Sequence, residues 1–279
     1  MENMTVIEVN HLVCSFHEKT ALVDISFEVD EGEIFGFLGP SGAGKTTTIN
    51  ILTGQLTPKS GTALVLGKES SQLVADDMVN LGIMSDTVGF YEKMSLYQNL
   101  AFFARFHRVP MERLEALLRR LDLWESRKTR AEKLSTGMRQ RMFLIRAILH
   151  EPKIVFLDEP TSGLDPVMSQ KVHELLVELK ENGMTIFLTT HDMQEATMLC
   201  DKLALLHRGR ICEYGSPQDI LERYRDDDRV EVRMLSGEVK LVPQEDVGLY
   251  LGKAASIHSL EPTLESVFIQ VTGERFDDK

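Results

Sequence analysis

Apolar residues in the first 38 positions broadly follow the two-residue period of strands and then merge into an unbroken apolar run. Residues 6–9 and 25–29 mix buried-type and polar side chains in near alternation, whereas residues 34–38 (IFGFL) carry no polar side chain. Alternation indicates a strand with one buried face, and a short continuous apolar run indicates a strand buried on both faces. The pattern therefore predicts strands within residues 5–38, the last of which is a buried strand ending at Leu38.

The spacing of apolar residues changes to that of helices between about residues 95 and 135. Leucine and phenylalanine recur near helical spacing in 96–106 and 111–124, and charged residues fill the other face of the second segment. Strands return at 154–157 and 185–190, with a helical segment between them. Strand–helix–strand order is typical of a parallel sheet. The chain is therefore predicted to be an α/β protein with a helical insertion at about residues 90–150.

The pattern also predicts shorter elements and a second domain. Strands are expected at 62–67 and 81–84, and a hairpin over 207–217 with its turn at Arg208-Gly209. The charge run RYRDDDR at 223–229 indicates a linker or a solvated loop, and the remaining residues resemble strands and one helix. We therefore expect a main domain over residues 1–222 and a small α+β accessory domain over residues 223–279.

Composition restricts the possible partners. The chain carries 43 acidic and 31 basic residues, for a net charge of −12, whereas a broad nucleic-acid interface needs a basic face. Its three cysteines, Cys14, Cys200 and Cys212, indicate neither a disulfide framework nor a zinc site and fit a reducing cytoplasm. No apolar run approaches the ~18 residues that span a bilayer, and no basic-plus-apolar signal opens the sequence. Any membrane role is expected to come through a partner.

A glycine-rich loop, GPSGAGKTT, directly follows the predicted buried strand. It matches G-x-x-x-x-G-K-[ST], a pattern in which open backbone N–H groups bind phosphates. The loop comprises Gly39, Pro40, Ser41, Gly42, Ala43, Gly44, Lys45, Thr46 and Thr47. We expect Lys45 to reach the outer phosphates and the Thr46 hydroxyl to bind Mg²⁺, and the dipole of the next helix also favours an anion. The alternative is a glycine-rich turn that binds no ligand.

Two further strand ends carry side chains suited to phosphate chemistry. The strand at 154–157 leads into Asp158 and Glu159, and the strand at 185–190 leads into His191. The carboxyl ends of parallel strands are where ligands bind in such sheets. We expect Asp158 to hold Mg²⁺ through water, Glu159 to polarise an attacking water and His191 to sense a γ-phosphate oxygen. The alternatives are an ordinary loop start for the two acids and a structural role for the histidine.

A second helix start has the character of an anion site. Ser135 in the segment LSTGM is a typical N-cap residue for a helix that runs to about His150. This helix end is separated in sequence from the phosphate loop by the helical insertion. The alternative is simple helix capping.

Together, the motifs resemble the nucleotide-binding subunit of an ATP-binding-cassette (ABC) transporter, in the same order over residues 5 to about 220. In that resemblance GPSGAGKTT is Walker A, IVFLDE is Walker B with its catalytic glutamate, and His191 is the switch histidine. LSTGM is a variant of the LSGGQ signature that contains Ser135, Thr136, Gly137 and Met138. SGLD is the D-loop, formed by Ser162, Gly163, Leu164 and Asp165. Phe16 matches the aromatic residue that stacks on adenine, or it belongs to the core.

The resemblance implies a P-loop NTPase fold with an antiparallel β subdomain, and it implies ATP and Mg²⁺ as cofactors. It also implies two cassettes packed head to tail, with each ATP held by Walker A of one copy and by Ser135 and Gly137 of the other. A second copy of this chain and a separate integral membrane permease are the expected partners. The helical insertion and the segment around Phe90-Tyr91 are expected to pass motion to that permease, at the inner face of the cell membrane.

Two positions depart from the family pattern. Asp86 occupies the place where the Q-loop normally has glutamine, and a carboxylate can bind Mg²⁺ but cannot donate an amide hydrogen bond. In the signature, Thr136 and Met138 replace glycine and glutamine, while the serine and the second glycine are retained. We therefore expect the contact with the second copy to be preserved.

The tail at residues 259–274 (SLEPTLESVFIQVTGE) is similar to that of cassettes from antibiotic and drug exporters, of the daunorubicin, bacitracin or lantibiotic type. This similarity favours an ATPase that powers efflux of an antibiotic, peptide or drug. A soluble cassette that acts on nucleic acid or ribosomes is the main alternative, and the acidic composition disfavours it. A phosphate-loop kinase explains Walker A but gives no role to LSTGM or His191.

Overall fold

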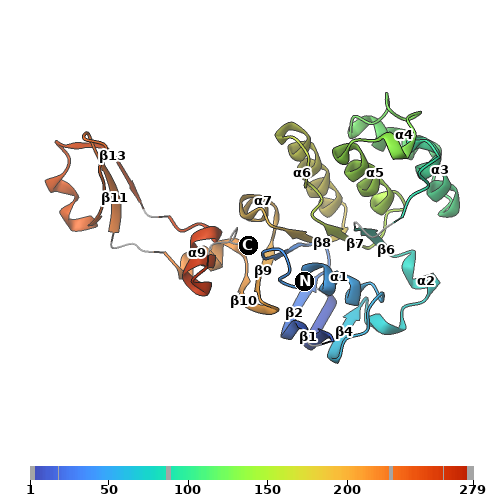
Figure 1. The fold of residues 1–279 in the computed structure, drawn as a ribbon, viewed down its shortest axis with the longest axis horizontal. Helices are drawn as coiled ribbons and strands as arrows, with labels where there is room; N and C mark the ends of the chain where they lie inside the picture. Colours follow the sequence, from blue (N-terminus) through green and yellow to red (C-terminus); the bar gives the residue numbers. More distant parts are fainter. Residues whose placement is uncertain (1–3, 18, 86–88, 226–228, 260, 275–279) are drawn as a thin grey trace. The chain divides into compact units, whose positions relative to one another are not determined.

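The fold is described from a computed structural model, which describes residues 4–17, 19–85, 89–225, 229–259 and 261–274 (Figure 1). The chain divides into two compact units, one up to Tyr214 and one from Gly215. Both units mix helices and strands, and the predicted α/β class with one antiparallel and one parallel sheet in the main unit is confirmed.

The antiparallel sheet of the first unit has the strand order β2-β1-β4-β5. Its strands are β1 (Thr5–Phe16), β2 (Lys19–Asp30), β4 (Ser60–Val65) and β5 (Lys68–Glu69). Val9 lies opposite Phe27 on one side and Ala63 on the other, and all three side chains are buried. One face of this sheet therefore belongs to the core, as the alternating pattern predicts.

The second sheet of this unit has the order β10-β9-β3-β8-β7-β6. Its strands are β3 (Ile34–Leu38), β6 (Leu81–Met84), β7 (Ile154–Asp158), β8 (Thr185–Thr190), β9 (Lys202–His207) and β10 (Arg210–Gly215). Parallel pairing places Asp158 beside Thr189, and Leu38 beside Thr190. The carboxyl ends of β3, β7 and β8 consequently meet at one edge, where the predicted motifs begin.

Phenylalanine rings join the two sheets. Phe27 of β2 stacks on Phe35 of β3 with ring centroids 5.4 Å apart, and Phe187 of β8 lies 5.5 Å from Phe35. Each of these rings is buried, and burial of such a side chain contributes about 1.5–3 kcal/mol. This aromatic core keeps the strands that carry the phosphate loop and His191 in fixed register.

Helices cover the parallel sheet and form the insertion (Figure 1). The helices of the sheet layer are α1 (Lys45–Leu52), α2 (Ala75–Met78), α6 (Pro166–Glu181) and α7 (Met193–Leu199). The insertion contains α3 (Leu96–Phe106), α4 (Met111–Arg120) and α5 (Thr136–Ile148), which agrees with the helical spacing of its sequence. Among the described residues, no helix is both long enough and apolar enough to cross a membrane.

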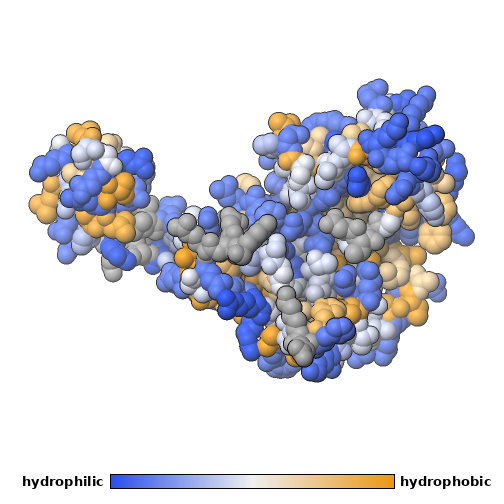
Figure 2. Space-filling model, viewed as in Figure 1, coloured by the Kyte–Doolittle hydropathy of each residue, from blue (hydrophilic) through white to orange (hydrophobic). Residues whose placement is uncertain are grey.

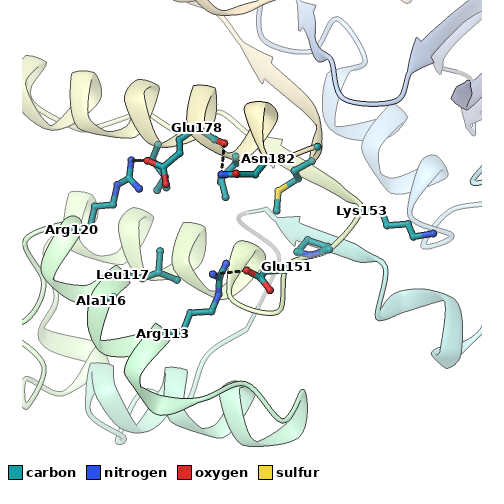
Figure 3. Close-up of a pocket in the computed structure, with 13 residues that line it drawn as sticks. Arg113, Ala116, Leu117, Arg120, Glu151, Lys153, Glu178 and Asn182 are labelled. Atoms are coloured by element: carbon teal, nitrogen blue, oxygen red, sulfur yellow. Dashed lines mark hydrogen bonds and ion pairs between the residues drawn. The ribbon is translucent and has the colours of Figure 1, made fainter. Parts of the chain in front are cut away.

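A cleft of about 680 Å³ opens between α4 and α6 (Figure 3). Two ion pairs lie along it, Arg113–Glu151 and Arg120–Glu178, each with an N–O distance of 2.7 Å. Its walls include the residues just before β7 and β8, so it lies at the amino ends of these strands. The cleft is therefore at the sheet edge opposite the phosphate loop.

The second unit contains α8 (Pro217–Arg223), α9 (Leu264–Thr272) and an antiparallel sheet with the order β12-β11-β13. Its strands are β11 (Arg229–Met234), β12 (Val239–Pro243) and β13 (Ala254–Ser259). Val230, Val232 and Val242 form a small core in the sheet, and Ile220 and Phe268 are buried on the two helices. The predicted domain boundary after residue 222 falls within α8, and the assignment of residues 223–279 as an accessory domain stays a prediction.

Candidate functional site

The glycine-rich loop connects β3 to α1 in a conformation that requires glycine. Gly44 caps α1 with a φ of 116°, and a Cβ atom there would lie 2.8 Å from the Ala21 carbonyl oxygen. A Cβ atom on Gly39 would lie 2.4 Å from the Leu206 carbonyl oxygen. No side chain fits at either position, so the backbone of the loop stays open at the N-terminus of α1.

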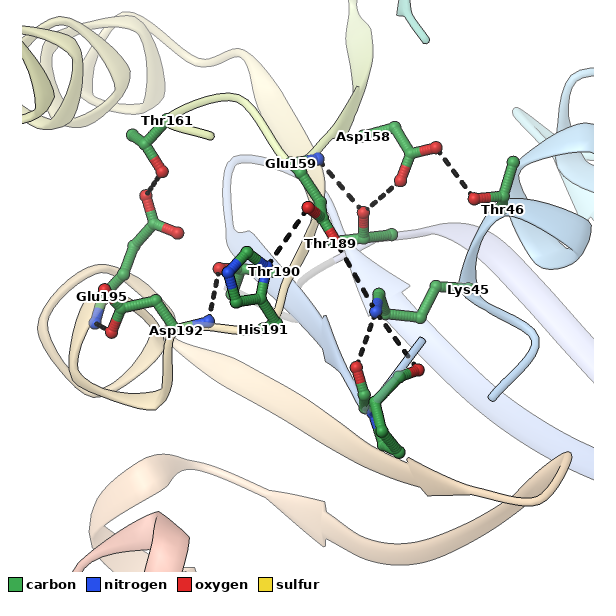
Figure 4. A network of polar contacts seen from close by, with 12 residues as sticks. Lys45, Thr46, Asp158, Glu159, Thr161, Thr189, Thr190, His191, Asp192 and Glu195 are labelled. Atoms are coloured by element: carbon green, nitrogen blue, oxygen red, sulfur yellow. Dashed lines mark hydrogen bonds and ion pairs between the residues drawn. The ribbon is translucent and has the colours of Figure 1, made fainter. Parts of the chain in front are cut away.

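Lys45, at the start of α1, is buried, with 7% of its side chain exposed. Its Nζ atom donates a hydrogen bond to the Gly39 carbonyl oxygen at 2.6 Å and lies 3.6 Å from Oε1 of Glu159. Burial lowers the pKa of Lys45, and the negative charges of Glu159 and Asp158 oppose that shift. The ammonium group is thus held against the loop and beside the acids at the end of β7 (Figure 4).

Asp158 connects three elements of the site. It accepts hydrogen bonds from the Thr46 hydroxyl of α1 at 2.9 Å and from the Thr189 hydroxyl of β8 at 2.5 Å. Carboxylate and hydroxyl oxygens are hard ligands, and Mg²⁺ commonly uses one or two such protein groups together with phosphate oxygens. Within the described ranges, no group of three or more His, Cys, Asp or Glu residues could hold a metal ion by itself. The donor set fits Mg²⁺ that is bound together with a phosphate ligand.

Glu159 has a left-handed backbone with a φ of 49°. This conformation is unfavourable for a residue with a Cβ atom, by about 1–2 kcal/mol. Its N–H donates to the Thr189 carbonyl oxygen at 3.1 Å, and its own carbonyl oxygen accepts from Nε2 of Gln140 at 2.6 Å. These bonds hold the side chain so that Oε2 lies 3.2 Å from Nδ1 of His191 (Figure 4).

A cleft of about 360 Å³ extends from Glu159 over the phosphate loop. Phe16 lies at this cleft together with Ala21, and 48% of the Phe16 side chain is exposed. Phe16 is therefore available to a ligand. Its exposure does not support the alternative that Phe16 belongs to the core.

The signature segment forms a helix start outside this cleft. Ser135 caps α5, and its hydroxyl accepts a hydrogen bond from the Met138 N–H at 3.2 Å. A Cβ atom on Gly137 would lie 3.2 Å from the Gly163 carbonyl oxygen, so the signature and the D-loop of one chain are neighbours. Among the described residues that line the phosphate-loop cleft, none comes from the LSTGM segment.

The D-loop leads into α6. Asp165 caps this helix by accepting a hydrogen bond from the Met168 N–H at 3.1 Å, and Pro166 occupies its first turn. Ser162, Gly163 and Leu164 line a cleft of about 530 Å³ together with His191. The loop therefore lies between the signature segment and the end of β8.

Several contacts in the site lie beyond the sequence motifs. Gln140, Thr189 and Glu195 hold the strand ends together, although their sequence positions appear ordinary on a helix or a strand. The only available signal was their position next to LSTGM and His191. Asp86 lies outside the described residues, so its expected contact with Mg²⁺ stays a prediction.

Comparison with known proteins identifies relatives of this arrangement. The family model described as "ABC transporter" matches residues 22–162. A fluoroquinolones export ATP-binding protein of Mycobacterium tuberculosis (strain CDC 1551 / Oshkosh) is 39% identical over 266 residues, covering 91% of this chain and 88% of the relative. A Nod factor export ATP-binding protein I of Rhizobium johnstonii is 34% identical, covering 94% of this chain and 93% of the relative.

Solved structures agree with the sequence relatives. An ATP-binding subunit of an ABC transporter superposes with a TM-score of 0.71 at 30% identity, covering 78% of this chain and 93% of that chain. The cbiO1 protein of Clostridium perfringens, part of an ABC transporter complex, gives a TM-score of 0.67 at 28% identity, with coverages of 80% and 92%.

Proposed function

The chain belongs to the ABC transporter family and is the ATP-hydrolysing subunit of an exporter. From this premise we propose the role of each site residue in ATP binding and hydrolysis. The observation that carries the proposal is the meeting of Lys45, Asp158, Glu159 and His191 at one sheet edge. The relatives do not favour the alternative of a cassette that acts on nucleic acid or ribosomes.

ATP occupies the cleft over the phosphate loop. Phe16 stacks on the adenine ring, and the open backbone N–H groups of residues 39–47 bind the phosphates. Lys45 exchanges its bond with the Gly39 carbonyl oxygen for the outer phosphates. The exposure of Phe16 and the burial of Lys45 at the same cleft support this orientation.

Thr46 and Asp158 would hold Mg²⁺, and Asp86 would supply a further oxygen ligand. The bound ion supplies neutralisation of charge on the phosphate oxygens. The hydrogen bond from Thr46 to Asp158 supports this assignment, because it brings the two donor oxygens together at 2.9 Å.

Glu159 accepts a proton from the attacking water, and His191 orients Glu159 and contacts the γ-phosphate. A carboxylate with a solvent-facing side chain, one third of it exposed, can reach a water molecule. The contact between Glu159 and His191 supports a joint role at the two strand ends.

The site is completed by a second copy of this chain, which contributes Ser135, Thr136, Gly137 and Met138 together with its D-loop residues. The absence of LSTGM residues from the phosphate-loop cleft of one described chain supports this arrangement. Closure of the dimer on ATP and opening after hydrolysis then form a two-state switch.

Mixing of two inactive variants tests the shared site. Lys45→Ala and Ser135→Arg proteins are each expected to lack activity, whereas a mixed dimer has one site with an intact Lys45 and an intact Ser135. ATPase activity should return on mixing. If differently tagged copies form mixed dimers and no activity returns, the shared site is wrong.

The permease partner contacts the helical insertion. Tyr91, Phe102 and Phe106 are exposed at or near α3, and a shallow cleft of about 610 Å³ runs along the helix beside the two phenylalanines. Figure 2 shows hydrophobic surface at the right of the view, where Figure 1 places α3. An exposed apolar patch is typical of a protein interface.

Within the insertion, the segment around Phe90 contacts the signature helix α5 directly. Phe90 packs on Phe143 of α5 with ring centroids 5.8 Å apart, and Arg146 of α5 donates to the Gly89 carbonyl oxygen at 2.8 Å. These contacts support a route by which movement of the permease changes the position of Ser135. The chain would then lie on the cytoplasmic face of the membrane, held there by its permease.

The cargo is an antibiotic, a peptide or another drug-like molecule. This proposal is supported by relatives named for fluoroquinolones export and for linearmycin resistance. Co-purification with a polytopic membrane protein tests the partner. Deletion of the gene for this chain should make cells more sensitive to the drug. The wild-type gene should restore resistance, whereas a gene that encodes Glu159→Gln should not. Equal restoration by both genes would exclude ATP-driven efflux.

A further inference from the structure

Glu195 of α7 is a buried carboxylate outside the predicted motifs. Only 2% of its side chain is exposed. Its Oε1 atom accepts a hydrogen bond from the Thr161 hydroxyl at 2.7 Å and from Nε2 of His173 at 2.9 Å. Thr161 follows β7, and Figure 4 shows its hydroxyl group facing the Glu195 carboxylate. His173 lies on α6 and is 13% exposed, so one carboxylate on α7 connects three elements.

The hydrogen bonds keep this carboxyl group ionised. Burial raises the pKa of Glu195, but hydrogen bonds from His173, Thr190 and Thr161 outweigh burial and leave the pKa below its ordinary value. The bonds from Thr161 and His173 both end on Oε1, whereas Oε2 is buried without a hydrogen-bond partner among the described residues. A buried carboxylate with so few donors depends strongly on each of them. If Thr161 loses its hydroxyl group, the loop after β7 that carries Thr161 is therefore expected to move.

The positions of the partners connect Glu195 to the reaction. Thr161 lies two residues after Glu159, and Glu195 lies four residues after His191. The direct contact between Glu159 and His191 is open to water, with 33% and 56% of the side chains exposed. An exposed contact of this kind constrains geometry weakly, whereas the bond between Thr161 and Glu195 is part-buried and ends on a carboxylate that is 2% exposed.

The start of α7 is fixed independently of Thr161. The Asp192 side chain accepts hydrogen bonds from the N–H groups of Gln194 and Glu195, at 2.9 Å and 3.0 Å. Glu195 thus projects from a capped helix end that begins directly after His191. This arrangement provides a firm anchor for the loop that follows Glu159.

We propose that Glu195 is a positioning residue for ATP hydrolysis, which holds Thr161 and thereby keeps Glu159 in register with His191. The inference rests on the roles proposed above for Glu159 and His191. Glu195 acts through these residues and does not contact the reacting atoms. A misplacement of a catalytic group by about 1 Å is sufficient to reduce a rate about 100-fold.

Substitution of Thr161 tests this role without removal of the buried charge. Thr161→Val lacks the hydroxyl group, and we expect it to lower kcat by about 10- to 100-fold while KM for ATP changes less than about twofold. Thr161→Ser keeps the hydroxyl group and should restore most of kcat. Equal rates for the valine variant and the wild type, or no recovery in the serine variant, would overturn the proposal.

Thr197→Val is a matched control on α7. The Thr197 hydroxyl also makes a side-chain hydrogen bond, to the Met193 carbonyl oxygen at 2.7 Å, but this bond stays within one helix. Thr197→Val should therefore leave kcat within about twofold of the wild type. A loss as large as that of Thr161→Val would assign the effect to α7 stability and overturn the positioning role.

A double variant separates this inference from the proposed function. If Thr161 acts through Glu159, Thr161→Val should cause no further loss in the residual activity of Glu159→Gln. A full additional loss would contradict the coupling. If Glu159→Gln alone turns over normally, the role of Glu159 fails; if it stalls while Thr161→Val turns over normally, only the positioning role fails.

Discussion

His191 and Glu159 contact each other across two neighbouring strand ends, with Nδ1 of the histidine 3.2 Å from Oε2 of the glutamate. The other carboxylate oxygen of Glu159 lies 3.6 Å from Nζ of Lys45. One carboxylate therefore faces two nitrogen groups in this state. A γ-phosphate that attracts Lys45 would free one carboxylate oxygen of Glu159 to accept a proton from water, while the other oxygen stays beside His191.

Glu159→Gln should retain ATP binding and stall hydrolysis. The amide has nearly the shape of the carboxylate but cannot accept a proton from water, so we expect the ATPase rate to fall by about 100-fold or more. The ATP-bound dimer should then accumulate, as measured by size-exclusion chromatography with light scattering. Glu174→Gln, at an exposed position of α6, is the control with the same change in charge. Wild-type turnover in Glu159→Gln would refute the assignment of the base.

Phe16→Ala should raise KM for ATP by about 5- to 30-fold, because stacking of a base on an aromatic side chain contributes about 1–2 kcal/mol. Phe16→Tyr keeps the aromatic face and should bind ATP as the wild type does. Nucleotide titration followed by fluorescence measures both variants. Since nearly half of Phe16 is exposed, its free energy of unfolding should change little. A large loss of stability with unchanged ATP affinity would make Phe16 a core residue.

The catalytic edge could be predicted from sequence because it follows from strand burial. The apolar run at 154–157 has to lie inside a sheet, so Asp158 and Glu159 emerge at its carboxyl end. The left-handed backbone of Glu159 could not be predicted, since no glycine marks it. That conformation depends on hydrogen bonds with Gln140 and Thr189, which lie 19 and 30 residues away in sequence.

Glu195 illustrates the same limit at a side chain. Glutamate on a short helix is normally a surface residue, and no spacing rule marks one that is buried. Its partners, His173 and Thr161, lie 22 and 34 residues away in sequence. The pairing of β7 with β8 and the packing of α6 and α7 against β8 bring them together. Helix α8 has a local start signal in the sequence, Ser216 followed by Pro217. The prediction assigned both residues to the hairpin at 207–217 and therefore missed this helix.

Asp86→Ala should raise the Mg²⁺ concentration needed for half-maximal activity if Asp86 is a ligand of the ion. Loss of one oxygen ligand weakens binding of the ion, while the ATP affinity measured without Mg²⁺ should not change. Asp86→Gln is the matched control, because its amide oxygen can still bind Mg²⁺ and its amide N–H can donate a hydrogen bond. Superimposable Mg²⁺ titrations of Asp86→Ala and wild type would remove Asp86 from the metal site.

Phe106→Ser should separate ATP hydrolysis from transport. Phe106 is 73% exposed at the end of α3, so its replacement should leave the fold and the ATPase rate of the isolated subunit unchanged. In the proposed interface it packs on the permease, and its loss should reduce co-purification with the permease and drug resistance in cells. Leu249→Ser in the second unit is the matched control, because Leu249 is also 73% exposed. Equal loss of permease binding in both variants, or in neither, would move the interface away from α3.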